Sequence, residues 1–178
     1  MNNKLIKNAF LCNIIFIILT ATLFHFLFDI FNKPIFLAAF LPVNESIFEH
    51  TKLLFTPTII TFIIFYFFIC KRKINKEKAL SSLIISISFS IITMLSLYYL
   101  TQLFFTKEMM IVNILILFIG TVAGQILALL TYKKDIKWSK EISIYSLITM
   151  TVIFLIFTLN PPYLDFFYDT QNMSYGIR

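Results

Sequence analysis

Charge is scarce in this sequence, and so are the residues that build disulfide scaffolds and flexible linkers. Charged residues make up 13% of the chain, whereas a soluble domain carries roughly 25%. Two cysteines exclude a disulfide scaffold, and with three glycines there is no Gly/Ser linker to separate domains. Hydrophobic residues reach 59%, including 22 Phe, which excludes a disordered chain and exceeds what a soluble fold of this size buries. We therefore predict a single all-α integral membrane domain over residues 1–178.

Five apolar stretches are long enough to cross about 30 Å of hydrocarbon as helices. With their polar beginnings included, they cover residues 9–28, 44–70, 79–105, 109–132 and 142–159. Residues 160–178 follow as an aromatic, acidic tail that is too polar to span. None of the stretches shows the alternation of a β-barrel strand. The sequence therefore predicts a bundle of five transmembrane helices surrounded by lipid.

The basic residues predict the orientation of this bundle. With the N-terminus in the cytoplasm, most of them lie on the cytoplasmic side, namely Lys4, Lys7, Lys71, Arg72, Lys73, Lys76, Lys78, Lys133, Lys134, Lys137 and Lys140. The outer side keeps Lys33, Lys52, Lys107 and Arg178. The positive-inside rule then predicts a multi-pass cell-membrane protein with a cytoplasmic N-terminus and an extracytoplasmic C-terminus. Orientation explains the net charge of +6, and the sequence lacks the basic, aromatic pattern of a nucleic-acid groove.

Residues 29–52 join the first two spans on the outer side. Their middle part, residues 34–41, is too short to cross the bilayer and too apolar to lie in water, which predicts a re-entrant or interfacial segment. Asn44 or Ser46 can cap the second helix, and Ser46 with Glu49 matches a capping box. We expect this helix to begin near Asn44.

Polar residues gather around this connection. His25 and Asp29 are four residues apart and share a helical face, as Glu45 and Glu49 do if both are helical. Like charges at that spacing repel, so Glu45 and Glu49 call for compensation by Lys52, by a bound cation or by a raised pKa of one of the two acids. Ionisable groups this close to the bilayer usually face protein or water. The predicted polar site, at the outer end of the first two spans, comprises His25, Asp29, Asn44, Glu45, Glu49, His50 and Lys52.

Two imidazoles and up to three carboxylates suit a divalent transition metal such as zinc. The candidate metal ligands are His25, Asp29, Glu45, Glu49 and His50, although their spacing matches no established ligand motif. Two other interpretations stay open at this point. The residues can bind a ligand or ion without chemistry, or they can form a structural cluster in which a helix cap and its dipole hold the acids.

Two further features concern packing. Gly120 and Gly124 are four apart on the fourth span, a spacing that lets helices approach closely within the chain or in a homo-oligomer. The tail is expected on the outer surface, either as a lid over the polar site or as a plain surface segment.

The run PVNESIFEHTK at residues 42–52 resembles the signature of an uncharacterised bacterial family of small integral membrane proteins. That family shows PVNES, an aromatic residue and EH-x-K before a membrane span. The aromatic-flanked His25 and a tail ending near Tyr175 and Gly176 resemble the same family. The resemblance implies about five membrane helices and no particular activity.

Three classes of function follow. The first is an intramembrane hydrolase in which a metal-activated water attacks a lipid or peptide bond, with one glutamate as base and Lys52 stabilising negative charge. The second is a solute-binding or transport component. The third is a structural accessory protein whose polar cluster only holds the connecting segment in place.

Overall fold

The computed structural model describes residues 3–65, 75–105 and 109–177, and it is an all-α bundle. Its five long helices are α1 (Asn3–Ile30), α2 (Ile47–Ile64), α3 (Lys76–Gln102), α4 (Met110–Lys133) and α5 (Lys140–Leu159). Each contains a stretch long and apolar enough to cross a membrane, which confirms the predicted helical membrane fold. Residues 66–70 of the second predicted span lie outside the described residues.

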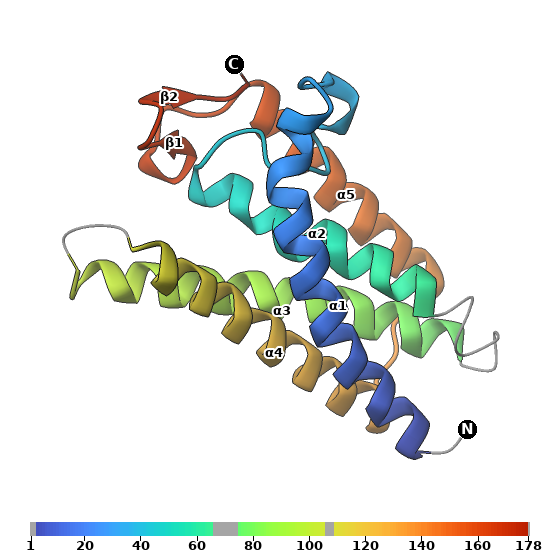
Figure 1. Ribbon diagram of the computed structural model, residues 1–178. Coiled ribbons are helices and arrows are strands. Elements are labelled where there is room, and N and C mark those ends of the chain that lie inside the picture. Colours follow the sequence, from blue (N-terminus) through green and yellow to red (C-terminus); the bar gives the residue numbers. More distant parts are fainter. Residues whose placement is uncertain (1–2, 66–74, 106–108, 178) are drawn as a thin grey trace.

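The helices place the two termini at opposite ends of the molecule (Figure 1). α1 packs against α2 and α4, and α3 packs against α2, α4 and α5. The connection between α1 and α2 lies at the same end as the C-terminal tail (Figure 1). Segments far apart in the sequence therefore meet at one end of the bundle.

α3 and α4 approach closely at the two glycines of α4. A Cβ atom added to Gly124 would lie 2.0 Å from Ser90 Oγ and 2.5 Å from the Ser86 carbonyl oxygen. One added to Gly120 would lie 2.9 Å from the Ser90 carbonyl oxygen. This small-residue face is therefore covered by α3 of the same chain, and a homo-oligomer built on Gly120 and Gly124 would have to displace α3.

The segment between α1 and α2 does not cross the bundle. After α1, Asn32 and Lys33 adopt left-handed backbone angles, with φ of 61° and 57°, and turn the chain back. A short 3₁₀ helix, η1 (Ile35–Leu37), follows and continues in turns. Ala38 and Leu41 are buried against Phe28 of α1. The segment thus returns to the end of the bundle where it began, as predicted for a re-entrant or interfacial piece.

The tail folds back onto the beginning of α2. It contains a 3₁₀ helix, η3 (Asp165–Phe167), and two short antiparallel strands, β1 (Tyr168–Asp169) and β2 (Ser174–Tyr175). Phe48 lies with its ring centroid 4.7 Å from that of Phe167 and 5.6 Å from that of Phe154 on α5. Aromatic packing therefore holds the tail against α2 and α5.

Candidate metal centre

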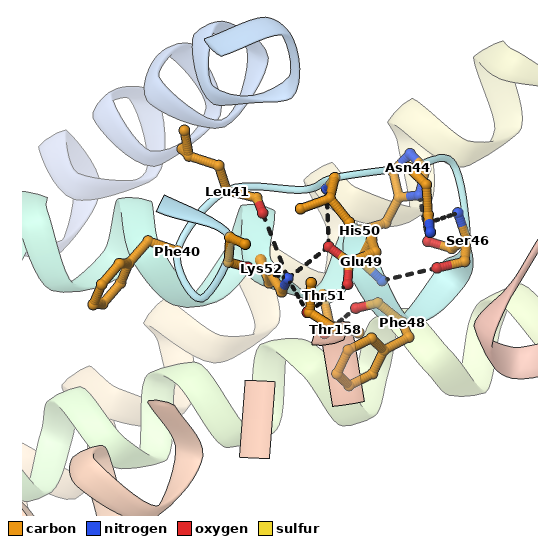
Figure 2. A network of polar contacts seen from close by, with 12 residues as sticks. Phe40, Leu41, Asn44, Ser46, Phe48, Glu49, His50, Thr51, Lys52 and Thr158 are labelled. Atoms are coloured by element: carbon orange, nitrogen blue, oxygen red, sulfur yellow. Dashed lines mark hydrogen bonds and ion pairs between the residues drawn. The ribbon is translucent and has the colours of Figure 1, made fainter. Parts of the chain in front are cut away.

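The beginning of α2 is fixed by side chains of the loop before it (Figure 2). Ser46 is the N-cap, and its Oγ accepts a hydrogen bond from the Glu49 backbone N–H at 3.4 Å, as predicted. Asn44 Oδ1 accepts from the Ser46 backbone N–H at 2.9 Å. Glu49 departs from the capping box, because its carboxylate accepts from the Val43 backbone N–H at 2.9 Å rather than from Ser46. The loop is held on both sides of the cap.

α2 begins at Ile47, so Glu45 precedes the helix instead of lying on it. The expectation that Glu45 and Glu49 share a helical face is therefore wrong. Their carboxylates separate: the Glu45 carboxylate turns toward α1, and the Glu49 carboxylate turns toward Lys52. Because the two carboxylates lie near different partners, the repulsion expected between Glu45 and Glu49 on one helical face does not arise.

Three of the predicted residues converge where α1 meets the beginning of α2. His25 Nε2 lies 3.5 Å from Glu45 Oε1, and His50 Nε2 lies 3.5 Å from Glu45 Oε2. One ligand atom from each residue lies within 4.8 Å of the other two. The side chains of His25, Glu45 and His50 are 25%, 29% and 21% exposed, so the group is shielded but reachable.

These separations suit a tetrahedral ion. Ligand atoms about 2.0–2.2 Å from a tetrahedral zinc stand roughly 3.3–3.6 Å from one another. The two nitrogen–oxygen distances, each 3.5 Å and each to a different oxygen of Glu45, fall in that range. The donor set of two imidazoles and one carboxylate is also one that zinc accepts. The three residues therefore bring donor atoms of a suitable kind within 4.8 Å of one another, close enough for one ion to bind them all.

The orientation of His50 is set by a hydrogen bond. Its Nδ1 lies 2.9 Å from the Ser46 carbonyl oxygen, which can only accept, so Nδ1 carries the proton. In the neutral imidazole, Nε2 then turns its lone pair toward Glu45. A histidine whose other nitrogen donates to a backbone carbonyl is the usual arrangement of a metal ligand.

His25 comes from the last turns of α1 and lies beside His50, with ring centroids 5.4 Å apart. Its Nδ1 is buried and has no hydrogen-bond partner among the described residues. Asp29 and Glu49, which the sequence analysis named as candidate ligands, lie outside this group of three residues. The Asp29 side chain is 78% exposed, and its Oδ1 lies 3.6 Å from Lys33 Nζ.

Glu49 and Lys52 form a separate, buried network, which Figure 2 shows. Lys52 Nζ donates to Glu49 Oε2 at 2.6 Å, to the Ala38 carbonyl oxygen at 2.6 Å and to Thr158 Oγ1 at 2.5 Å. Thr158 Oγ1 in turn donates to Glu49 Oε1 at 2.7 Å. All three protons of Lys52 and both oxygens of Glu49 are thus engaged, and the network joins the connecting segment to α2 and α5.

One residue that the sequence analysis missed holds Glu45. Asp169 on β1 is fully buried, and its Oδ2 accepts from the Glu45 backbone N–H at 3.2 Å. Burial would raise the pKa of Asp169, but hydrogen bonds from Asn172, Glu45 and Gln171 outweigh that effect and lower the pKa below its ordinary value. Nearby, Asn44 Nδ2 donates to the Gly176 carbonyl oxygen at 3.0 Å. In the sequence analysis, these contacts are foreshadowed only by the alternative in which the tail lies over the polar site as a lid.

The comparison with known proteins identifies the family and no more. No curated protein and no solved structure matches the chain. A family described as "Family of unknown function (DUF6512)" matches residues 1–177. With its five apolar helices, the chain is a multi-pass membrane protein that belongs to this family of unknown function.

Proposed function

We propose that the protein binds a divalent transition metal, best suited to zinc, through His25 Nε2, the Glu45 carboxylate and His50 Nε2. The observation that carries the proposal is the convergence of these three groups within 4.8 Å. They are supplied by α1, the connecting loop and α2, and they include both histidines of the chain.

The lone pairs supply the physical argument. Because Nδ1 of His50 donates to Ser46, its Nε2 faces an oxygen of Glu45 as one acceptor facing another. Such a contact needs a cation between the two atoms or a proton on the imidazole. A charge-assisted N–H···O bond is usually about 2.7–2.9 Å long. The observed 3.5 Å is longer and suits two ligands of a shared ion better.

A second candidate function, an intramembrane hydrolase, is favoured by the number of ligands. Three protein ligands leave one tetrahedral position for water, as in catalytic zinc sites. The metal would supply an activated water for attack on a lipid or peptide bond. Among the described residues, Glu49 is fully engaged with Lys52 and Thr158, so we do not assign it the role of general base. Glu45 is a ligand in this proposal, so it is not assigned that role either.

Metal analysis of the purified protein in detergent tests the proposal. We expect about one zinc per chain after reconstitution and dialysis. His50→Ala and Glu45→Gln should each lower the zinc affinity by more than about 100-fold, beyond the 10–100-fold typical of groups that only orient a ligand. Asp29→Asn is the matched control, since this carboxylate lies one turn from His25 but pairs with Lys33.

Two outcomes would count against this proposal. If the wild type retains no more zinc than a variant lacking both histidines, there is no metal centre, and a structural cluster or a solute-binding component is favoured. If Asp29→Asn loses zinc as severely as Glu45→Gln, the set of three ligands proposed here is wrong.

A further inference from the structure

We propose that the C-terminal hairpin sets the affinity of the metal site, and that Asp169 is the positioning residue for the ligand Glu45. This inference rests on the proposed function, but it concerns a part of the chain that supplies no ligand. It predicts that residues of the C-terminal tail change the affinity of the site for the metal.

Glu45 is the ligand that most needs external support. His25 and His50 are carried by α1 and α2, whose backbones are fixed by their own hydrogen bonds. Glu45 lies in the loop before the Ser46 cap, outside any helix. Ligands on loops are held less accurately than ligands on helices unless neighbouring groups fix them. The position of Glu45 therefore depends on what its backbone contacts.

Asp169 supplies that contact and divides its two oxygens between two tasks. Oδ1 accepts from the backbone N–H groups of Gln171 and Asn172, at 2.9 and 3.0 Å, and closes the turn of the hairpin. Oδ2 accepts from Asn172 Nδ2 at 2.9 Å and from the Glu45 backbone N–H at 3.2 Å. One carboxylate thus ties the hairpin turn to the backbone of the ligand.

A second contact holds the loop next to Glu45. Asn44 Nδ2 donates to the Gly176 carbonyl oxygen at 3.0 Å. Gly176 adopts φ of +69°, and a Cβ added there would lie 3.3 Å from Pro161 and from the Thr158 carbonyl oxygen. This position therefore favours glycine on conformational and steric grounds. The tail therefore forms hydrogen bonds with the loop at both Asn44 and Glu45.

The hairpin is itself anchored, so it can hold the loop firmly. Phe167, next to β1, packs at 4.7 Å from Phe48 and 5.4 Å from Phe157, measured between ring centroids. Tyr168 and Tyr175 pair across the two strands with centroids 5.1 Å apart. These contacts connect the hairpin to α2 and α5.

The test uses Asp169→Asn, which keeps the shape of the side chain. Its amide oxygen can still accept from the turn N–H groups, while its NH₂ group then faces the Glu45 N–H as one donor facing another. Asn44→Asp is a second variant: it keeps the acceptor for Ser46 but loses the donor to Gly176. Because its added negative charge would by itself strengthen cation binding, a weakened affinity would report the lost contact. Asp165→Asn is the matched control, because it removes an exposed carboxylate from the same tail.

Two readouts are measured on the full chain in detergent: the zinc dissociation constant, and the imidazole ¹⁵N chemical shifts of the metal-free protein. The chain has only two histidines, so both signals can be assigned. We expect Asp169→Asn and Asn44→Asp to weaken zinc binding by about 10–100-fold. Both variants should also shift the two imidazole signals, because the Glu45 carboxylate moves away from them. Asp165→Asn should change neither readout.

The outcomes separate the two proposals. If the wild type binds zinc and neither variant changes the affinity, the tail has no positioning role, although the metal centre stands. If the wild type binds no zinc but the variants shift both imidazole signals, the positioning role stands and the metal function falls. If zinc binding and the signals are both unaffected by the variants, the inference is overturned. A change in unfolding temperature without a change in the signals would likewise overturn it.

Discussion

Lys52 and Glu49 lie three residues apart on α2 and form an ion pair that the fold encloses completely. The Nζ–Oε2 distance is 2.6 Å, and the two side chains are 0% and 2% exposed. Lys52 also contacts the connecting segment through Ala38, and both partners contact Thr158 on α5. Buried ion pairs of this kind are costly to break singly, because the remaining charge has no solvent to stabilise it.

Removing one partner of this pair should strongly destabilise the protein. Lys52→Met leaves the Glu49 carboxylate buried, and we expect a loss of about 3–5 kcal/mol in the free energy of unfolding. Denaturant titration in detergent measures it. Lys33→Met is the control, because the Lys33–Asp29 pair is exposed and should contribute about 0–1 kcal/mol. Equal unfolding midpoints for the two variants would show that the buried pair contributes little.

The contact between α3 and α4 should not tolerate a methyl group. In Gly124→Ala the new Cβ meets Ser90 Oγ and the Ser86 carbonyl oxygen, and the backbone oxygen can move only with its helix. We expect a destabilisation of about 1–3 kcal/mol, the usual range for overpacking. Adding Ser90→Gly should restore part of the lost stability, since it removes one of the two clashing atoms. Thermal unfolding of the wild type, Gly124→Ala and the double variant is the measurement. Equal melting temperatures for all three proteins would contradict the prediction.

The loop after α4 should respond to acid through Asp135. A hydrogen bond from the Lys78 side chain, on the first turn of α3, is the largest cause that lowers the pKa of Asp135 below its ordinary 3.8. A lowered pKa means that this contact stabilises the folded state above pH 3.8 and is lost as the pH falls through the lowered value. Lys78→Met should raise the pKa of Asp135 toward its ordinary value, with Lys137 still lowering it, as measured by NMR titration of the carboxyl carbon. An unchanged titration would show that Lys78 does not set it.

The orientation predicted from the basic residues can be read with reporters. A reporter fused after Arg178 should be active outside the cytoplasm, and one fused after Asn75 should be active only within it. Five crossings require the two ends of the chain to lie on opposite sides. Reporters showing both ends on one side would rule out this topology.

The sequence predicts the helices well because their signal is local. Apolar runs of about twenty residues become spanning helices wherever they occur, and the Ser46 cap follows from its own neighbours. The error concerned the residue at which α2 begins. Placing the start near Asn44 put Glu45 and Glu49 on one face, whereas the helix begins at Ile47 and sends the two carboxylates to different partners.

The partners of the site were less accessible to sequence reasoning. His25 and Asp29 share a helical face, but the exposed Asp29 carboxylate forms an ion pair with Lys33. Asp169 reaches Glu45 across 124 residues, and no periodicity links two such positions. Contacts of this kind depend on how the tail packs, which only the whole fold determines.

The long separation between these partners also bears on the order in which the protein folds. Lys52 and Glu49 lie 106 and 109 residues before Thr158, and Asn44 lies 132 residues before Gly176. During synthesis, α1 and α2 therefore reach the membrane long before α5 and the hairpin emerge. The charged cluster at the beginning of α2 has to remain hydrated or be shielded by the insertion machinery during that interval. Closure of this end of the bundle is then the last event of assembly rather than the first.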